Sequence, residues 1–522
     1  MFTIEKAKSG ELTLLFNGKS IHSKYAPKAE AVTFLNKQTI KKSSRLFLLL
    51  GPGLGYLKLA ILKAFPNAKI LSIHMDQYIF EHSLKLGENW TYGDKTSLSY
   101  KLSSFISDFQ ILETQIIKWK PCTNLFPTRL EDIEAKIQQF YKERKGTIFT
   151  TGAFGNAWIR NIQYNYEKSN KYKFIKNIDS TIIIAASGPT LKEDMDLLKL
   201  NRDKYILAAL PSSLSALNHA QIIPDFIFHT DPGYWAKEHL KLINNNSIPI
   251  IMPLTASFYF KITNPVILFN QGSYIENYLL KQLFITIPPH GTVAGTAYLF
   301  FRQITSKPII FMGLDFSYKD IEEHVNPHSF DILYLSKQNR FLGYLHLLYE
   351  KHQSFVINTK DLNTNQAFLT YSGWFNNENR INTAFRFNPS SVKTKGLTPI
   401  SALQLAGIVT SSNNFYTLLD ISIDSKNLLT HTNIKKLFND LLDLIIRFEQ
   451  NINSFNEESI LNFFTQPGLL LEFLQYTDYS DIIELAHNYK TDINKSKDIL
   501  NKIYSKSFNY ISYLIERYNY GR

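Results

Sequence analysis

A short polar turn in the middle of the chain has the residue types that bind a phosphate group. Residues 181–186 read as a buried strand, and a Ser-Gly-Pro-Thr turn follows at 187–190. Thr190 and Glu193 have the spacing of a capping box, so we expect a helix to begin at Leu191. The N–H groups of that helix and the hydroxyls of the turn would face the carboxyl end of the strand, where ligands bind in open α/β sheets.

A histidine and a carboxylate follow a second apolar run. Residues 225–229 read as a strand, and His229 and Asp231 stand at its end, just before a proline. Asp231 either caps a turn or contacts a ribose or a base, and both interpretations stay open. Because Asp231 is not part of an Asp-x-Asp pair, the sequence does not support a divalent metal held by two carboxylates.

The last strand of this series precedes the groups that best suit acid–base chemistry. Thr292 is expected to open a helix, and a strand at 308–312 follows that helix and leads to Asp315. A polar loop then carries His324 and His328. Imidazole titrates near neutral pH, so either histidine suits the role of a general base.

A glycine-rich turn near the start of the chain is a separate candidate. An apolar strand runs into a GxGxG pattern at 51–55, and a helix is expected from Tyr56. Asp76 lies 21 residues after Gly55, where an acid would meet ribose hydroxyls. The pattern is similar to that of S-adenosylmethionine-dependent methyltransferases. The other interpretation is a tight strand–helix turn in a Rossmann-like domain that binds nothing.

Three parts are expected to position these groups. Residues 1–175 are predicted to form a Rossmann-like α/β domain, and 176–400 alternate strands with helices, which predicts a mainly parallel sheet. Residues 401–522 have apolar residues at three- and four-residue spacing, which predicts a helical domain. The predicted strands of the middle part are 181–185, 205–209, 225–229, 248–252, 265–269 and 308–312.

Composition excludes several classes of protein. The 522 residues carry 57 Lys and Arg against 45 Asp and Glu, a formal charge of +12, and residues 1–180 hold all of that excess. Without a nucleic-acid motif we expect no nucleic-acid partner. One cysteine, Cys122, excludes an internal disulfide. We expect a cytoplasmic protein without a membrane span, since no apolar run approaches ~18 residues and the start lacks the layout of a secretion signal.

Taken together, the motifs resemble a known family. Their order and spacing are similar to those of the Maf (motility-associated factor) proteins, which are bacterial flagellin glycosyltransferases. That family shares an MptE-like domain (DUF115) with the archaeal 6-hydroxymethylpterin pyrophosphokinases. The core also resembles bacterial sialyltransferases with a modified Rossmann fold. The motifs are Ala-Ala-Ser-Gly-Pro-Thr-Leu (185–191), Ile-Pro-Asp-Phe-Ile-Phe-His-Thr-Asp (223–231), His-Gly-Thr-Val-Ala (290–294) and Phe-Met-Gly-Leu-Asp-Phe-Ser-Tyr (311–318).

The resemblance implies roles for particular residues. His324 is the first choice for the catalytic base, with Asp315, His328 and Asp231 as further candidates. His324 falls where Maf proteins tend to carry Thr-His-Ala, although here its neighbours are Glu and Val. The catalytic histidine of the sialyltransferases comes later in the chain and is not placed. The implied nucleotide and donor contacts are Ser187, Gly188, Pro189, Thr190, Ser212, Asp231, Thr292, Gly313 and Tyr318.

The implied activity is transfer of a nonulosonic acid, of the pseudaminic or legionaminic type, from a CMP-activated donor to Ser or Thr of flagellin. Neither a cofactor nor a metal is expected, because the CMP leaving group carries one phosphate. The first domain and the helical tail would hold the protein acceptor. Three alternatives stay open: a pterin-type pyrophosphokinase using ATP and Mg²⁺, a methyltransferase using the 51–55 turn and Asp76, and a non-enzymatic flagellin-binding protein.

Overall fold

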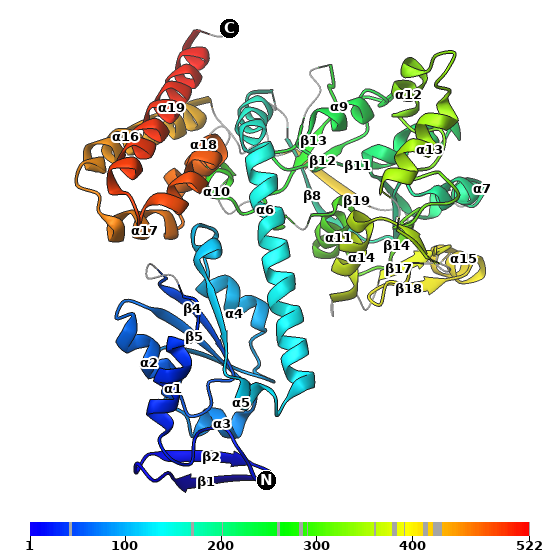
Figure 1. Ribbon diagram of the computed structural model, residues 1–522. Coiled ribbons are helices and arrows are strands. Elements are labelled where there is room, and N and C mark those ends of the chain that lie inside the picture. The colour runs from blue at the N-terminus through cyan, green and yellow to red at the C-terminus, as the bar shows by residue number, and fades with distance from the viewer. Residues whose placement is uncertain are drawn as a thin grey trace. The chain divides into compact units, whose positions relative to one another are not determined.

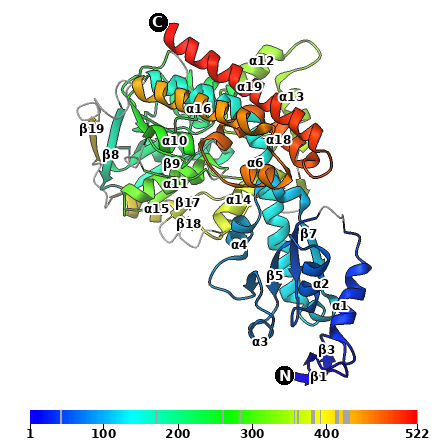
Figure 2. The same ribbon diagram turned by 90° about the vertical axis from the view of Figure 1, so that its left-hand side faces the viewer.

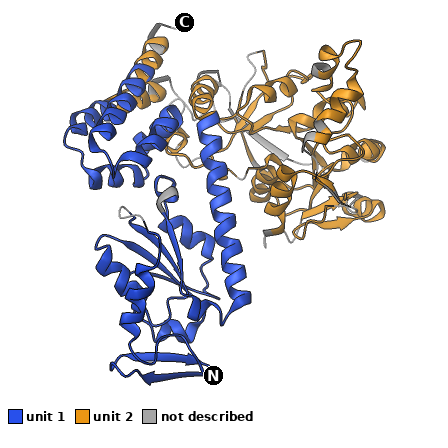
Figure 3. Cartoon of the chain, viewed as in Figure 1, with its two compact units in different colours: residues 1–153, 443–510 blue, residues 154–442, 511–522 orange. Residues whose placement is uncertain are grey.

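The chain folds into two compact units. Unit 1 comprises residues 1–153 and 443–510, and unit 2 comprises 154–442 and 511–522 (Figure 3). The boundaries expected at 175 and 400 stay predictions. The computed structural model describes residues 1–520 apart from 41–43, 169–171, 201, 258–260, 281–284, 290, 356, 360–361, 378–383, 391, 411–415 and 421–430.

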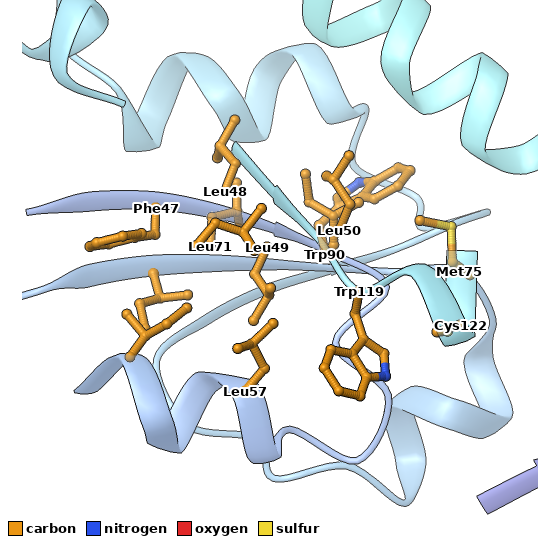
Figure 4. Close-up of a cluster of buried hydrophobic side chains, with 14 of the residues drawn as sticks. Phe47, Leu48, Leu49, Leu50, Leu57, Leu71, Met75, Trp90, Trp119 and Cys122 are labelled. Carbon is orange, nitrogen blue, oxygen red and sulfur yellow. The ribbon is translucent and has the colours of Figure 1, made fainter. Parts of the chain in front are cut away.

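Unit 1 is built on a parallel sheet of four strands in the order β6-β5-β4-β7. Its central strand β4 reads Leu-Phe-Leu-Leu-Leu and is buried throughout, as expected for a parallel strand covered on both faces. Figure 4 shows these side chains with Leu57 and Trp119 in one cluster. The strands are β4 (Leu46–Leu50), β5 (Lys69–His74), β6 (Glu88–Thr91) and β7 (Gln115–Lys118), with a separate antiparallel sheet of β1 (Phe2–Lys6), β2 (Leu12–Phe16) and β3 (Lys19–Ser20).

Helices complete unit 1. From His431 the described chain is helical, as predicted, although the strand β19 (Tyr416–Asp420) interrupts the helical pattern expected from 401. This helical part contributes α17, α18, the end of α16 and most of α19 to unit 1. The long helix α6 begins in unit 1 and ends in unit 2 (Figure 1). The helices are α1 (Pro27–Asn36), α2 (Tyr56–Ala64), α3 (Gln77–Glu81), α4 (Leu98–Phe105), η1 (Asp108–Glu113), α5 (Lys120–Thr123), α6 (Pro127–Lys168), α16 (His431–Ile452), α17 (Glu457–Thr465), α18 (Leu469–Asn488) and α19 (Ile493–Tyr520).

Unit 2 is built on a sheet of ten described strands. Their order is β18-β17-β14-β9-β10-β11-β12-β13-β8-β19, and all pairs are parallel except β19 with β8, which form one edge (Figure 2). All six strands predicted for the middle of the chain are present, each shorter by one or two residues. The strands are β8 (Tyr172–Ile178), β9 (Ile182–Ala185), β10 (Ile206–Ala209), β11 (Phe226–Phe228), β12 (Ile250–Met252), β13 (Val266–Leu268), β14 (Ile309–Met312), β17 (Ala384–Phe387), β18 (Thr398–Ile400) and β19 (Tyr416–Asp420).

Helix α11 packs on this sheet through a face of small and aromatic residues. Ala294 and Ala297 allow a close approach, while Phe300 and Phe301 fill the space above β9 and β11. The predicted α/β fold with parallel sheets is therefore confirmed. The remaining helices are η2 (Pro189–Asp194), α7 (Met195–Leu200), η3 (Arg202–Lys204), η4 (Pro211–Ser213), α8 (Leu214–His219), α9 (Tyr234–Leu240), α10 (Tyr274–Leu280), α11 (Val293–Ile304), α12 (Asp331–Lys337), α13 (Tyr344–Phe355), α14 (Gln366–Asn377) and α15 (Ala402–Thr410), and a hairpin is formed by β15 (Ile357–Thr359) and β16 (Leu362–Thr364).

Candidate active site

The strand order of unit 2 creates a topological switch point between β9 and β14. The chain runs outward from β9 through β10, β11, β12 and β13, and then returns to place β14 on the other side of β9 (Figure 1). Ligands of open α/β sheets bind outside the carboxyl ends of the strands at such a point. The turn at 187–190 follows β9 and the Gly-Leu-Asp segment at 313–315 follows β14. Two of the predicted motifs therefore meet at this point.

Glycines let the two motifs touch. The Gly188 N–H donates a hydrogen bond of 2.7 Å to the Gly313 carbonyl oxygen. A Cβ atom at position 188 would lie 2.6 Å from that oxygen, and closer still to a carboxylate oxygen of Asp315. Gly313 has a φ of +64°, and a Cβ there would lie 2.7 Å from the Cβ of Leu191. Side chains at either position would force the two loops apart.

The Asp315 carboxylate lies at the N-terminal end of η2, the end of a helix that attracts a negative charge. Its carboxylate accepts hydrogen bonds from the Thr190 N–H at 2.8 Å and from the Thr190 hydroxyl at 2.7 Å. Burial raises the pKa of Asp315, and the two bonds from Thr190 oppose that rise. The buried Arg386 donates to the backbone carbonyl of Asp315 at 3.0 Å. These contacts fix the carboxylate against the turn.

The prediction that a capping box starts an α-helix at Leu191 is wrong. The segment begins instead as the 3₁₀ helix η2 with Gly188 at its N-cap, and it becomes the α-helix α7 only at Met195. Tertiary contacts take both residues of the expected capping box. The Thr190 hydroxyl donates a hydrogen bond to Asp315, 125 positions further along the chain, and Glu193 forms an ion pair with Lys319.

His324 lies directly against the turn. Its Nδ1 is 3.3 Å from the Ser187 hydroxyl oxygen, and the neighbouring Val325 N–H donates to the Ser187 carbonyl at 2.8 Å. The His324 ring stacks on His328, with centroids 4.4 Å apart and planes 12° apart. The structure therefore brings the first-choice base into contact with the predicted phosphate turn.

His239, on α9, joins the two loop histidines. Its ring meets His328 edge to face at 5.2 Å, and its Nδ1 forms a hydrogen bond with the Ser329 hydroxyl. Burial, together with the charge of a protonated His324, lowers the pKa of His239 to about 4, so this imidazole is neutral at physiological pH. A neutral neighbour does not repel a proton that His324 receives.

Two groups at the end of β11 have local structural partners. His229 is buried, its Nε2 lies 2.7 Å from the Ser257 carbonyl oxygen, and burial lowers its pKa. Asp231 is exposed, and its carboxylate accepts a 2.6 Å hydrogen bond from the Gly233 N–H, which closes its own turn. Of the two interpretations open for Asp231, turn capping is the one with a visible contact.

The remaining predicted residues are distributed around the same edge of the sheet. Thr292 is the N-cap of α11, as expected, although its side chain makes no capping hydrogen bond. Ser212 lies half-buried in η4, after β10. Tyr318 is buried, and its hydroxyl accepts a 3.0 Å bond from the Asn365 amide.

A cleft opens beside His324. The loop after β14 forms one wall, and α12 and α13 form the other. Sequence reasoning missed His352 in this cleft, as well as His239 and Arg386. His352 is buried on α13 and packs edge to face on Tyr318 with centroids 5.2 Å apart. Spacing alone does not show which side chains of α13 turn toward a loop nearly thirty positions earlier.

The glycine-rich turn of unit 1 is filled by the protein's own side chains. The His22 ring accepts a 2.8 Å hydrogen bond from the Leu54 N–H, and a Cβ at Gly53 would collide with it. Burial lowers the pKa of His22 to about 3, so the ring stays neutral. A Cβ at Gly51 would lie 2.9 Å from Thr123. The glycines therefore have a packing explanation, which favours the interpretation that the turn binds no ligand.

Asp76 is likewise used structurally, so we expect Asp76→Ala to leave the activity of unit 2 unchanged. Asp76 caps α3 through the Tyr78 N–H at 2.9 Å and pairs with Arg129 at 2.8 Å. Its loss should cost about 1–2 kcal/mol of stability. Calorimetry should detect no binding of S-adenosylmethionine, whereas micromolar binding would revive the methyltransferase alternative.

Within the described residues, no three His, Cys, Asp or Glu side chains converge as the ligands of a metal ion. No described helix is both long enough and apolar enough to span a bilayer.

Fold and site together define a doubly wound α/β protein with its candidate site at the β9–β14 switch point. Residues 156–321 match the family model described as 6-hydroxymethylpterin diphosphokinase MptE-like. The middle of the chain therefore matches the MptE-like family, as the motifs predicted.

Comparison of whole chains extends the likeness. The Maf glycosyltransferase from Magnetospirillum magneticum AMB-1 has the same fold, with a TM-score of 0.63 and 13% identity, over 99% of this chain and 92% of that one. Two proteins of Treponema pallidum (strain Nichols), both named only as uncharacterized, are also similar. One is 26% identical over 58% of this chain and 68% of its own length, and the other is 25% identical over 22% and 56%.

Proposed function

We propose that the protein is a glycosyltransferase that moves a sugar from a nucleotide-activated donor to a hydroxyl group. In its finer form, the proposal is transfer of a nonulosonic acid from a CMP donor to Ser or Thr of flagellin, in the cytoplasm and without a metal. The observation that most supports this proposal is the contact between His324 and Ser187 at the switch point, in a chain that shares the fold of a Maf glycosyltransferase.

His324 is proposed as the base that receives the acceptor proton. When its Nδ1–H donates to the Ser187 oxygen, the basic lone pair of the imidazole is on Nε2. Ser187 is then a positioning residue that selects this tautomer. Asp315 already accepts two bonds from Thr190, which suits it better to holding the turn than to taking a proton.

The donor phosphate is proposed to face the start of α11. This helix runs back from the carboxyl edge of the sheet to the start of β14, so its first N–H groups lie at that edge. Thr292 does not cap them, and a phosphate there would gain their hydrogen bonds and the favourable helix dipole. These donors would also stabilise the negative charge that grows on CMP as the glycosidic bond breaks.

Mass spectrometry of flagellin provides the test in the cell. If the proposal is right, flagellin from a strain lacking this gene should lose the mass of the sugar on its modified serines and threonines. Complementation with the wild-type gene should restore that mass. Unchanged flagellin in the deletion strain would reject flagellin as the acceptor.

A pyrophosphokinase is the second candidate, because the matching family model carries that name. Nucleotide-dependent stability separates the two, since a ligand that binds the native state raises the melting temperature. We expect CMP or CDP to raise it in the presence of EDTA. Stabilisation by ATP with Mg²⁺ alone, and no effect of cytidine nucleotides, would favour pyrophosphate transfer.

A further inference from the structure

The cleft beside His324 combines negative charge with aromatic surface. Glu322, Glu323 and Asp331 line it, and its described lining includes neither lysine nor arginine. Asp331 is held in place by the Tyr344 hydroxyl at 2.8 Å and by the His328 N–H at 2.6 Å. Its aromatic lining residues are Tyr318, Phe330, Tyr334 and Tyr344.

This charge makes the cleft unsuitable for the proposed donor. A CMP-activated nonulosonic acid carries a phosphate and a carboxylate, and the three carboxylates that line the cleft would repel both. His324 touches Ser187 of the turn and also lines the cleft. As the base, His324 must contact the hydroxyl whose proton it takes. Because its Nδ1 is directed at Ser187, we place the acceptor hydroxyl on the cleft side of the ring.

His352 indicates that the cleft takes a hydrogen-bonding ligand. The side chain is 8% exposed, and neither ring nitrogen has a hydrogen-bond partner among the described residues. Both ring nitrogens of an imidazole can form hydrogen bonds, and leaving both unsatisfied in a buried position is costly. A hydroxyl or a peptide group of a ligand would satisfy them.

Exposed apolar side chains lie on the helices that line the cleft. Large ones stand on α12, α13 and the segment between them, and the same helices supply Tyr334 and Tyr344 to the cleft. Exposed apolar side chains beside a charged cleft suit the side chains of a polypeptide better than a bare sugar. The exposed residues are Leu335, Phe341, Leu345 and Tyr349.

Building on the proposed glycosyl transfer, we infer that this cleft is the acceptor site. It takes a polypeptide segment whose target Ser or Thr is flanked by basic and apolar side chains rather than by acidic ones. Charge complementarity with the three carboxylates sets the preference, and His352 and the aromatic rings hold the backbone and the apolar flanks.

Fluorescence anisotropy with the full-length protein and no donor tests this inference. The probes are two short labelled peptides that place a serine between phenylalanines and either lysines or glutamates. At low ionic strength the lysine peptide should bind about tenfold more tightly. Glu322→Lys should abolish or reverse that preference, while Asp179→Lys, at an exposed acid before β9, should keep it. His352→Phe should weaken both peptides, and His346→Phe, at an exposed position of α13, should weaken neither.

Equal binding of the two peptides, or a preference that Glu322→Lys leaves unchanged, would overturn the acceptor assignment. The readout does not depend on the chemistry. If the lysine peptide binds as expected but no CMP-sugar is transferred to it, the proposed function fails and the peptide site stands. If transfer occurs equally to both peptides and Glu322→Lys raises the KM for the donor instead, the proposed function stands and the acceptor site lies elsewhere.

Discussion

His324→Ala should lower the turnover number by about 10²–10⁴-fold, which is the usual contribution of a positioned general base. Donor binding should change little, because the donor phosphate is assigned to the start of α11. Steady-state kinetics with varied donor and acceptor measures both effects.

His346→Ala is the matched control, because this histidine is exposed on α13 and pairs with Glu350. His328→Ala is a poor control, because the His328 ring stacks on His324 and His328 is itself a further candidate for the base. Ser187→Ala should cost less than His324→Ala, as it removes the partner of the imidazole and not the base itself. Full turnover in His324→Ala would show that His324 is not the base and would leave His352 and His328 as candidates.

The strands of unit 2 were predictable because each is a short apolar run followed by a turn. Buried parallel strands such as Ile182–Ala185 and Ile309–Met312 need apolar residues on both faces, so their signal is local and strong. Their order in the sheet is not local. Adjacency of β9 and β14 depends on a chain reversal after β13, and only the family resemblance indicated that their ends meet.

The contacts of the site were less predictable than its members. Ser187, Thr190, Asp315 and His324 were all named from motifs, yet the bond from Thr190 to Asp315 spans 125 positions and that from Ser187 to His324 spans 137. A local rule, the capping box, assigned Thr190 to its own helix. In the structure the Asp315 carboxylate, delivered by β14, accepts from both the N–H and the hydroxyl of Thr190, while Glu193 pairs with Lys319 instead.

Glycine-rich turns occur in both units, and sequence alone did not separate their roles. In unit 1 the space that the glycines leave is taken by His22, Thr123 and Leu84. In unit 2 the space beside Gly188 is taken by the loop of the neighbouring strand. The difference lies in which atoms approach the glycine, and those atoms come from distant parts of the sequence.

Gly188→Ala should therefore inactivate the protein and destabilise it by about 3 kcal/mol, the upper end of the usual cost of overpacking. The new methyl group would lie 2.6 Å from the Gly313 carbonyl oxygen. That oxygen belongs to the backbone at the end of β14, which cannot retreat without disturbing its pairing with β9. Chemical denaturation and transfer kinetics on the same preparation measure both losses.

Gly343→Ala is the matched control, because a Cβ there meets nothing within 4 Å. It should alter stability by less than about 0.5 kcal/mol and leave activity intact. Thr190→Val distinguishes the effect of overpacking from the effect of a lost hydrogen bond. It removes the hydrogen bond from the Thr190 hydroxyl to Asp315 and keeps the one from the Thr190 N–H. If movement of Asp315 causes the inactivation, Thr190→Val should show part of the catalytic loss with little loss of stability. A Gly188→Ala protein as stable and active as the wild type would mean that the loops after β9 and β14 separate easily and do not form a rigid site.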